Sequence, residues 1–131
     1  MDRKSGKRNE SFIEAVACAL RGIRSAFRTE RNFFRYLFIA LFFLIVNLLL
    51  RVPVIAHVIA VVTIAITFSV EILNTAIERL CDLETQEITE EIRVIKDLSA
   101  GAVLMSSLSF FISEIIFIVM QLIRIFSGGQ G

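Results

Sequence analysis

Four polar residues at helical spacing carry the strongest chemical signal in the sequence. They are three acids and an amide, separated by steps of three, four and four residues: Glu71, Asn74, Glu78 and Asp82. This spacing aligns the four side chains on one face of a single α-helix. A cluster of carboxylates on one face can hold a hard divalent cation. The same pattern is also typical of an ordinary solvated helix whose acids pair with Arg79 or Lys96, so spacing alone leaves both interpretations open.

A second candidate group is the dipeptide Lys96-Asp97, which stands at the start of a long apolar run. Lys96 could contact a phosphate, with Asp97 as the partner that aims it. Alternatively, both residues only end the helix at the lipid headgroups. The small residues of the segment 99–102 follow directly, and small residues let helices approach closely in lipid.

The composition indicates that lipid is the solvent around these residues. Of 131 residues, 56% are hydrophobic, and the mean hydropathy is +0.74. A soluble domain of this size leaves a large share of its chain at the surface and could not hide so much apolar area. The net charge of +1 gives no reason to expect a nucleic-acid partner. Cys18 and Cys81 are isolated and predict neither a metal site nor a disulfide.

The hydrophobic pattern predicts a single all-α integral membrane domain over residues 1–131. Three apolar segments, at about 33–50, 54–80 and 98–126, are long enough to span a bilayer, which takes about 20 residues. Before them, residues 1–10 form a basic tail, and residues 11–31 show the three- and four-residue apolar spacing of an amphipathic helix. We expect that helix to lie in the membrane surface, although packing against the bundle would produce the same stripe.

The basic residues predict the orientation of the chain in the membrane. Twelve of the 14 Lys and Arg residues lie before the first span or between the second and third, and only Arg51 and Arg124 lie elsewhere. By the positive-inside rule the N-terminus is cytoplasmic and the C-terminus is outside. Glu71 follows Val54 by 17 residues, or about 26 Å of helix, so the acidic face should emerge at the cytoplasmic boundary.

Two further polar residues stand at the outer ends of the spans. For His57, we favour a satisfied residue at the membrane interface over a ligand-binding role. For Glu114, we favour a side chain that reaches the interface, or pairs with Arg124 or Arg51, over a functional group.

Two longer motifs resemble a known family. Residues 70–78 read VEILNTAIE, residues 96–104 read KDLSAGAVL, and Asp82 lies between them. Together they resemble the signature of the prokaryotic diacylglycerol kinases, a family that includes the undecaprenol kinases. The resemblance covers roughly residues 12–120.

The resemblance implies that the chain transfers the γ-phosphoryl group of MgATP to the hydroxyl of a membrane lipid. It implies a homotrimer in a bacterial plasma membrane, with sites formed between protomers. Glu71 would be the general base, with Asn74 beside it, and Glu30 and Glu78 would carry Mg²⁺. The positions near the nucleotide would be Lys96, Asp97 and Asp82. Charge neutralisation by a metal ion and a lysine is what phosphoryl transfer needs most.

The resemblance leaves three functions to compare. We expect phosphorylation of diacylglycerol to phosphatidic acid, with phosphorylation of undecaprenol as the first alternative and a non-catalytic interaction protein as the second. Some positions differ from the family pattern: Ser11 and Cys18 replace a common Arg and Tyr, and Tyr36 replaces an acid of the diacylglycerol-specific members. The segment 30–33 is closer to the undecaprenol kinase branch.

Overall fold

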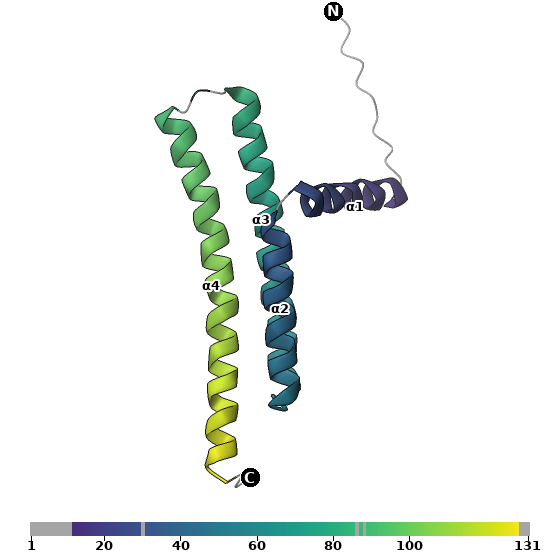
Figure 1. The fold of residues 1–131 in the computed structure, drawn as a ribbon. Helices are drawn as coiled ribbons and strands as arrows, with labels where there is room; N and C mark the ends of the chain where they lie inside the picture. The colour runs from purple at the N-terminus through teal and green to yellow at the C-terminus, as the bar shows by residue number, and fades with distance from the viewer. Residues whose placement is uncertain (1–11, 30, 86, 88, 129–131) are drawn as a thin grey trace, which may run out of the picture.

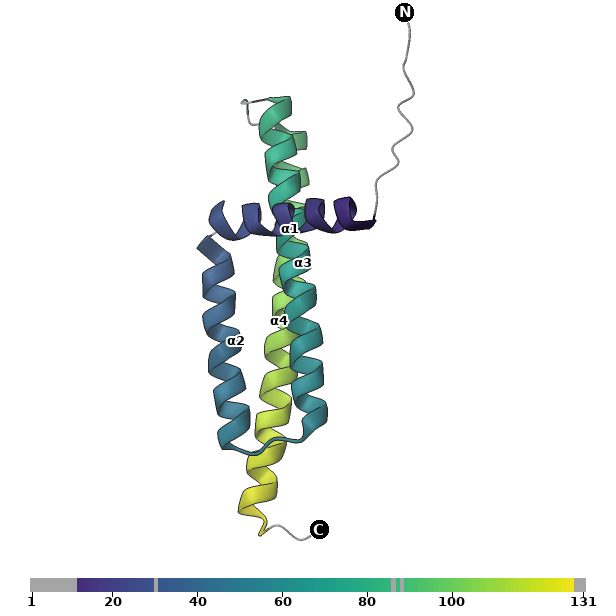
Figure 2. The same cartoon turned by 90° about the vertical axis from the view of Figure 1, so that its right-hand side faces the viewer.

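The computed structural model describes residues 12–29, 31–85, 87 and 89–128. Within these ranges the chain forms four α-helices: α1 (Phe12–Thr29), α2 (Arg31–Leu49), α3 (Val54–Glu84) and α4 (Glu90–Phe126). Helices α2, α3 and α4 run along a common axis, and α1 lies across them (Figure 1, Figure 2). The prediction of an all-α protein is confirmed, whereas the predicted basic tail lies outside the described residues.

Three of the four helices are long and apolar enough to cross a membrane. These are α2 from Asn32 onward, α3 and α4. Helix α3 has 31 residues and α4 has 37, or about 46 and 56 Å, so each exceeds the roughly 30 Å of hydrocarbon. Figures 1 and 2 show α3 and α4 continuing past the level of α1 toward their connection, and α4 also continuing past the α2–α3 turn at its C-terminal end. The expectation of three helices able to span a membrane is confirmed, and two of them are longer than a span requires.

Helix α4 begins earlier than the third span predicted from hydropathy. Its first residue is Glu90, because the Thr89 hydroxyl accepts a hydrogen bond from the backbone N–H of Ile92 at 3.3 Å. Such a cap satisfies one of the unpaired donors at a helix start, and the acids Glu90 and Glu91 suit the positive end of the helix dipole. Lys96 and Asp97 therefore lie inside a continuous helix and do not end it, contrary to one of the two interpretations above.

The opposite end of α2 closes with a tight turn into α3. The backbone N–H of Val52 donates to the carbonyl of Asn47 at 3.0 Å, and that of Arg51 donates to Leu48 at 3.2 Å. This pair of bonds is the Schellman motif, in which one residue takes a left-handed conformation. Arg51 supplies it with a φ of 55°, a conformation that costs a non-glycine residue about 1–2 kcal/mol.

An aromatic cluster fixes α1 to the membrane helices. The ring centroids of Phe27 on α1 and Phe33 on α2 are 4.6 Å apart, and those of Phe33 and Phe68 on α3 are 5.3 Å apart. Phe33 is fully buried. Large apolar side chains near the start of α1, such as Phe12 and Ile13, are exposed, as expected for a helix that dips its apolar face into lipid. The cluster lies beside Glu71 in the sequence of α3 and so sets the depth of the acidic face relative to α1.

Candidate functional site

The acidic face of α3 runs from a buried to an exposed environment. Glu71 is 3% exposed, Glu78 is partly buried, and Asp82 is exposed. The Phe27 ring of α1 contacts Phe68, which precedes Glu71 by three residues on α3, so Glu71 lies close to the level of α1. Asp82 follows Glu71 by 11 residues, in the direction in which α3 continues past α1 (Figure 2). The face therefore passes from the level of α1 into the part of the bundle that continues past it.

Asn74 and Glu78 form one unit of this face. The Asn74 Nδ2 atom donates a hydrogen bond to Glu78 Oε1 at 3.1 Å, which fixes the orientation of that carboxylate. The other polar atom of the amide, Asn74 Oδ1, is buried and has no hydrogen-bond partner. A buried acceptor without a partner costs free energy that an incoming donor can recover. An alcohol hydroxyl is such a donor.

Lys96 reaches across from α4 to the exposed end of the acidic face. Its Nζ atom lies 2.6 Å from Asp82 Oδ1. The hydrogen bond to Asp82 is the largest of the influences that raise the pKa of Lys96, and the charge of Glu78 adds to it. The ammonium group stays charged throughout the neutral range and lies near two of the predicted site residues.

Asp97 belongs to a different surface. It pairs with Arg93 one turn earlier on α4, at 3.6 Å, so within one chain Asp82, and not Asp97, is the carboxylate paired with Lys96; a role for Asp97 at the phosphates stays a prediction. The spacing within the dipeptide explains the difference, because adjacent residues on a helix point about 100° apart. Asp97 borders a shallow hollow on the outside of α4 together with Gly101 and Ala102. Within one chain, Asp97 is thus separated from the Lys96–Asp82 pair.

The predicted metal ligands can be compared with the structure only in part. Glu30 lies outside the described residues. Among the residues that are described, no group of three or more His, Cys, Asp or Glu side chains lies close enough together to hold a metal ion. Glu71 and Glu78 are two helical turns apart, about 10 Å. Glu78, oriented by Asn74, fits the common arrangement in which Mg²⁺ takes one or two carboxylates and completes its shell with water and phosphate oxygens.

One contact and one hollow near the face were not predicted from the sequence. The Arg79 guanidinium donates to Ser25 Oγ at 3.4 Å and so links α3 to α1. Arg21, Arg24 and Arg28 line a hollow around the same serine. The helical spacing of the basic residues indicated a polar stripe on α1, but nothing in the sequence indicated which helix that stripe would meet.

Comparisons with known proteins identify the family. The family model for prokaryotic diacylglycerol kinase matches residues 17–119. An undecaprenol kinase of Bacillus subtilis is 40% identical over 105 residues, which cover 79% of this chain and 85% of that protein. A diacylglycerol kinase of Synechocystis is 33% identical over 100 residues, which cover 76% of this chain but only 57% of that longer protein. The match includes the acidic face of α3 and the Lys96-Asp97 motif, and we conclude that the chain belongs to the prokaryotic diacylglycerol kinase family, a family of lipid kinases.

Proposed function

We propose that the chain transfers the γ-phosphoryl group of ATP to the hydroxyl of a lipid alcohol at the cytoplasmic face of a bacterial plasma membrane. The observation that carries the proposal is the polar face of α3, on which Glu71 is buried close to the contact of α3 with α1 and the acids further along the helix become exposed. A lipid hydroxyl approaches from the membrane and a nucleotide from water. This face is where the two environments meet.

Glu71 is the proposed general base. A base must lie within hydrogen-bond reach of the proton that it takes, and Glu71 is the acid placed deepest on the face. Asn74 Oδ1, buried and unpaired, can accept the one hydrogen bond that the lipid hydroxyl offers as it enters and so bring the alcohol beside Glu71, which takes that proton in the reaction. Burial of both groups excludes water, which would otherwise compete as the phosphoryl acceptor.

The nucleotide side of the proposed site uses charge. Glu78, oriented by Asn74, and Glu30 would hold Mg²⁺, which neutralises phosphate charge when bound. Lys96 supplies a second positive charge, and Asp82 keeps it in place across the two helices. Positioning and neutralisation of charge account for most of the catalysis of phosphoryl transfer.

We propose undecaprenol as the first lipid substrate to test, ahead of diacylglycerol. The reason is that the relative with 40% identity and 85% coverage carries the name undecaprenol kinase, and that Tyr36 stands where diacylglycerol-specific members have an acid. Diacylglycerol remains the second candidate because the 33% identical relative is named a diacylglycerol kinase. This order reverses the one suggested by the sequence.

A homotrimer is the proposed assembly. Asp97 faces away from the Lys96–Asp82 pair in one chain, so a second copy would have to bring its own Asp97 toward the acidic face if all the predicted residues act together. The hollow beside Asp97, lined by Gly101 and Ala102, has the small residues that close helix packing in lipid requires.

The test is ATP consumption by the purified protein in mixed micelles, with undecaprenol, diacylglycerol or no lipid alcohol added. We expect phosphorylated lipid with at least one alcohol and none without. Purified, folded protein that phosphorylates neither lipid would favour the non-catalytic alternative, in which the acidic face binds a protein partner.

A further inference from the structure

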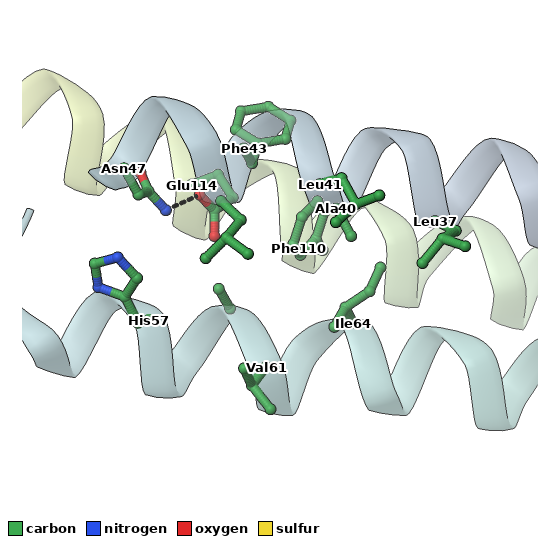
Figure 3. Close-up of a pocket in the computed structure, with 12 residues that line it drawn as sticks. Leu37, Ala40, Leu41, Phe43, Asn47, His57, Val61, Ile64, Phe110 and Glu114 are labelled. Atoms are coloured by element: carbon green, nitrogen blue, oxygen red, sulfur yellow. Dashed lines mark hydrogen bonds between the residues drawn. The ribbon is translucent and has the colours of Figure 1, made fainter. Parts of the chain in front are cut away.

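A second polar cluster lies at the other end of the bundle, where three membrane helices each contribute one residue. Asn47 comes from α2, His57 from α3 and Glu114 from α4, and they face one another across a cavity (Figure 3). Asn47 and Glu114 are each only 1% exposed. His57 precedes Glu71 by 14 residues on α3, which is about 21 Å of helix. The cluster is therefore separate from the proposed catalytic face.

The hydrogen bonds inside the cluster are incomplete. Asn47 Nδ2 donates to Glu114 Oε2 at 2.8 Å, but Asn47 Oδ1 is buried and has no partner. His57 Nδ1 lies 3.3 Å from the carbonyl oxygen of Pro53 and can bond to it only as a donor, so in the neutral ring Nε2 is an acceptor. That Nε2 atom is also buried without a partner. Two unpaired acceptors and a carboxylate thus border one cavity.

This set of atoms selects for a positively charged hydrogen-bond donor. A primary ammonium group has three N–H donors and no acceptor, and its charge compensates a carboxylate in apolar surroundings. A hydroxyl offers one donor and no charge. A hard divalent cation requires about six oxygen ligands, more than these three side chains supply.

The rest of the cavity is apolar and small. Its volume is about 150 Å³, a size at which an apolar protein cavity can admit a benzene ring. The walls include Leu41, Val61 and Phe110. We propose that this cavity binds the primary ammonium group of a lipophilic amine, with the nitrogen toward Asn47, His57 and Glu114 and the carbon body against the apolar walls. The ammonium can belong to a free amine or to the ethanolamine headgroup of a phospholipid.

The experiment uses the full-length protein in detergent micelles without aminophospholipid, titrated with benzylamine, benzyl alcohol or toluene. His57 is the single histidine of the chain, so its ring ¹⁵N resonances report on the cavity without ambiguity. We expect a saturable shift of the Nε2 resonance with benzylamine and at least about tenfold weaker binding of benzyl alcohol, because a charged hydrogen bond is replaced by a neutral one. Equal affinity for the three probes, or no saturable shift with benzylamine, would overturn the proposal.

Two variants sharpen the result. Glu114→Gln keeps the shape of the side chain but removes the charge, and should weaken benzylamine binding by about tenfold or more while leaving benzyl alcohol unaffected. Ser113→Ala is the matched control, because the Ser113 hydroxyl bonds back to the carbonyl of Phe110 within α4 and does not line the cavity. Wild-type affinity of Glu114→Gln for benzylamine would contradict the proposal. If that variant does not fold, the three probes on the wild-type protein still decide.

A further experiment with phospholipids distinguishes a free amine from an ethanolamine headgroup as the source of the ammonium group. In nanodiscs of phosphatidylcholine, whose quaternary headgroup has no N–H donor, the benzylamine shift should persist. If added phosphatidylethanolamine produces the same Nε2 shift and competes with benzylamine, the lipid headgroup occupies the site. If it does neither, the site takes free amines. None of these measurements depends on kinase activity, so the outcome is independent of the proposed function.

Discussion

The two ends of the helix bundle both carry carboxylates on membrane helices, but these carboxylates differ in burial and in the groups that bond to them. At the α3–α4 end the acids become progressively exposed, and the outermost, Asp82, forms an ion pair with Lys96. At the α2–α3 end Glu114 is buried and its bond is to a neutral amide, Asn47. The exposed Asp82–Lys96 pair keeps its contact with water. A carboxylate buried among apolar side chains has no water nearby and needs hydrogen bonds from uncharged protein donors instead.

The acidic face is thus a surface on which ligands can exchange with water, whereas the Asn47–Glu114 cluster lies among apolar side chains. The acidic face has a buried side chain at one end and exposed side chains at the other, which suits a reaction between a lipid and a nucleotide. The Asn47–Glu114 bond joins α2 to α4, and Gln121 strengthens the same junction by donating to the carbonyl of Leu50 at 2.9 Å. We expect changes at the first end to alter turnover and changes at the second to alter stability.

The largest effect should follow from Glu71→Gln. The change removes the proposed proton acceptor but keeps the shape of the side chain, so turnover should fall by about 10²- to 10⁴-fold while ATP binding is nearly unchanged. Steady-state kinetics in mixed micelles, together with equilibrium nucleotide binding, measure both quantities. Glu91→Gln, at an exposed position of α4, is the matched control and should keep wild-type turnover.

The same substitution at Glu78 distinguishes a base from a metal ligand. Glu78→Gln should weaken the apparent affinity for Mg²⁺, and high Mg²⁺ or Mn²⁺ should restore part of the activity. Titration of the metal against both variants tests the two roles. Rescue of Glu71→Gln by metal, or identical behaviour of the two variants, would show that the assigned roles are wrong.

The next prediction concerns Asp97 and Glu71, which we expect to act together only when they come from different chains. Asp97→Asn should lower turnover by about 10- to 100-fold if Asp97 helps to position the nucleotide. Mixed oligomers of Glu71→Gln and Asp97→Asn chains should then regain activity, because some interfaces combine an intact Glu71 with an intact Asp97 from another copy. Activity is measured after co-expression with two different purification tags. Mixed oligomers without recovered activity would place the site within a single chain.

The sequence predicted the helices and the acidic face well because both depend on local periodicity. The apolar runs and the three- and four-residue steps from Glu71 to Asp82 are properties of consecutive residues, and α3 places them as expected. A short helix before the third span was expected, but not its continuity with that span, although Thr89 followed by two acids is a recognisable cap for one long helix. Hydropathy shows where the apolar part of a helix begins, whereas α4 itself begins earlier, in a polar segment.

Contacts between distant segments could not be predicted. Asn47 and Glu114 are 67 residues apart, and each appeared in the sequence as a lone polar residue in an apolar run. The expectation that Glu114 reaches the interface or pairs with Arg51 or Arg124 is wrong, because α2 supplies a nearer partner in the bundle. Likewise, Asp97 follows Lys96 in sequence but points in another direction on the helix. Pairing of this kind depends on how the helices are rotated about their axes, which no single segment determines.

A smaller effect, on stability, should follow from Asn47→Leu. The substitution removes the hydrogen-bond donor of the buried Glu114, which should cost about 1–3 kcal/mol. The double change Asn47→Leu with Glu114→Leu should recover most of the loss, because no polar group is then left unpaired. Reversible unfolding in mixed micelles with increasing dodecyl sulfate measures the free energy. The neighbouring Leu48→Ala, on an exposed position, should stay within about 0.5 kcal/mol, and an equal loss there would show that the buried pair has no special role.

The smallest effect should come from Asp82→Asn, and it is best seen in the pH dependence of kcat/KM for ATP. The hydrogen bond from Lys96 to Asp82 raises the pKa of the ammonium group. Without the carboxylate this pKa falls, so Lys96 loses its charge at a lower pH. The alkaline limb of the profile should therefore move to lower pH, with a loss of only a few-fold at neutral pH, where the ammonium is still charged.

Lys96→Arg should give the opposite result, because the guanidinium stays protonated at high pH and the limb should disappear from the accessible range. If Asp82→Asn leaves the alkaline limb in place while Lys96→Arg abolishes it, Lys96 is the titrating group but Asp82 does not tune it. If neither change moves the limb, Lys96 does not act on the phosphates as a charge.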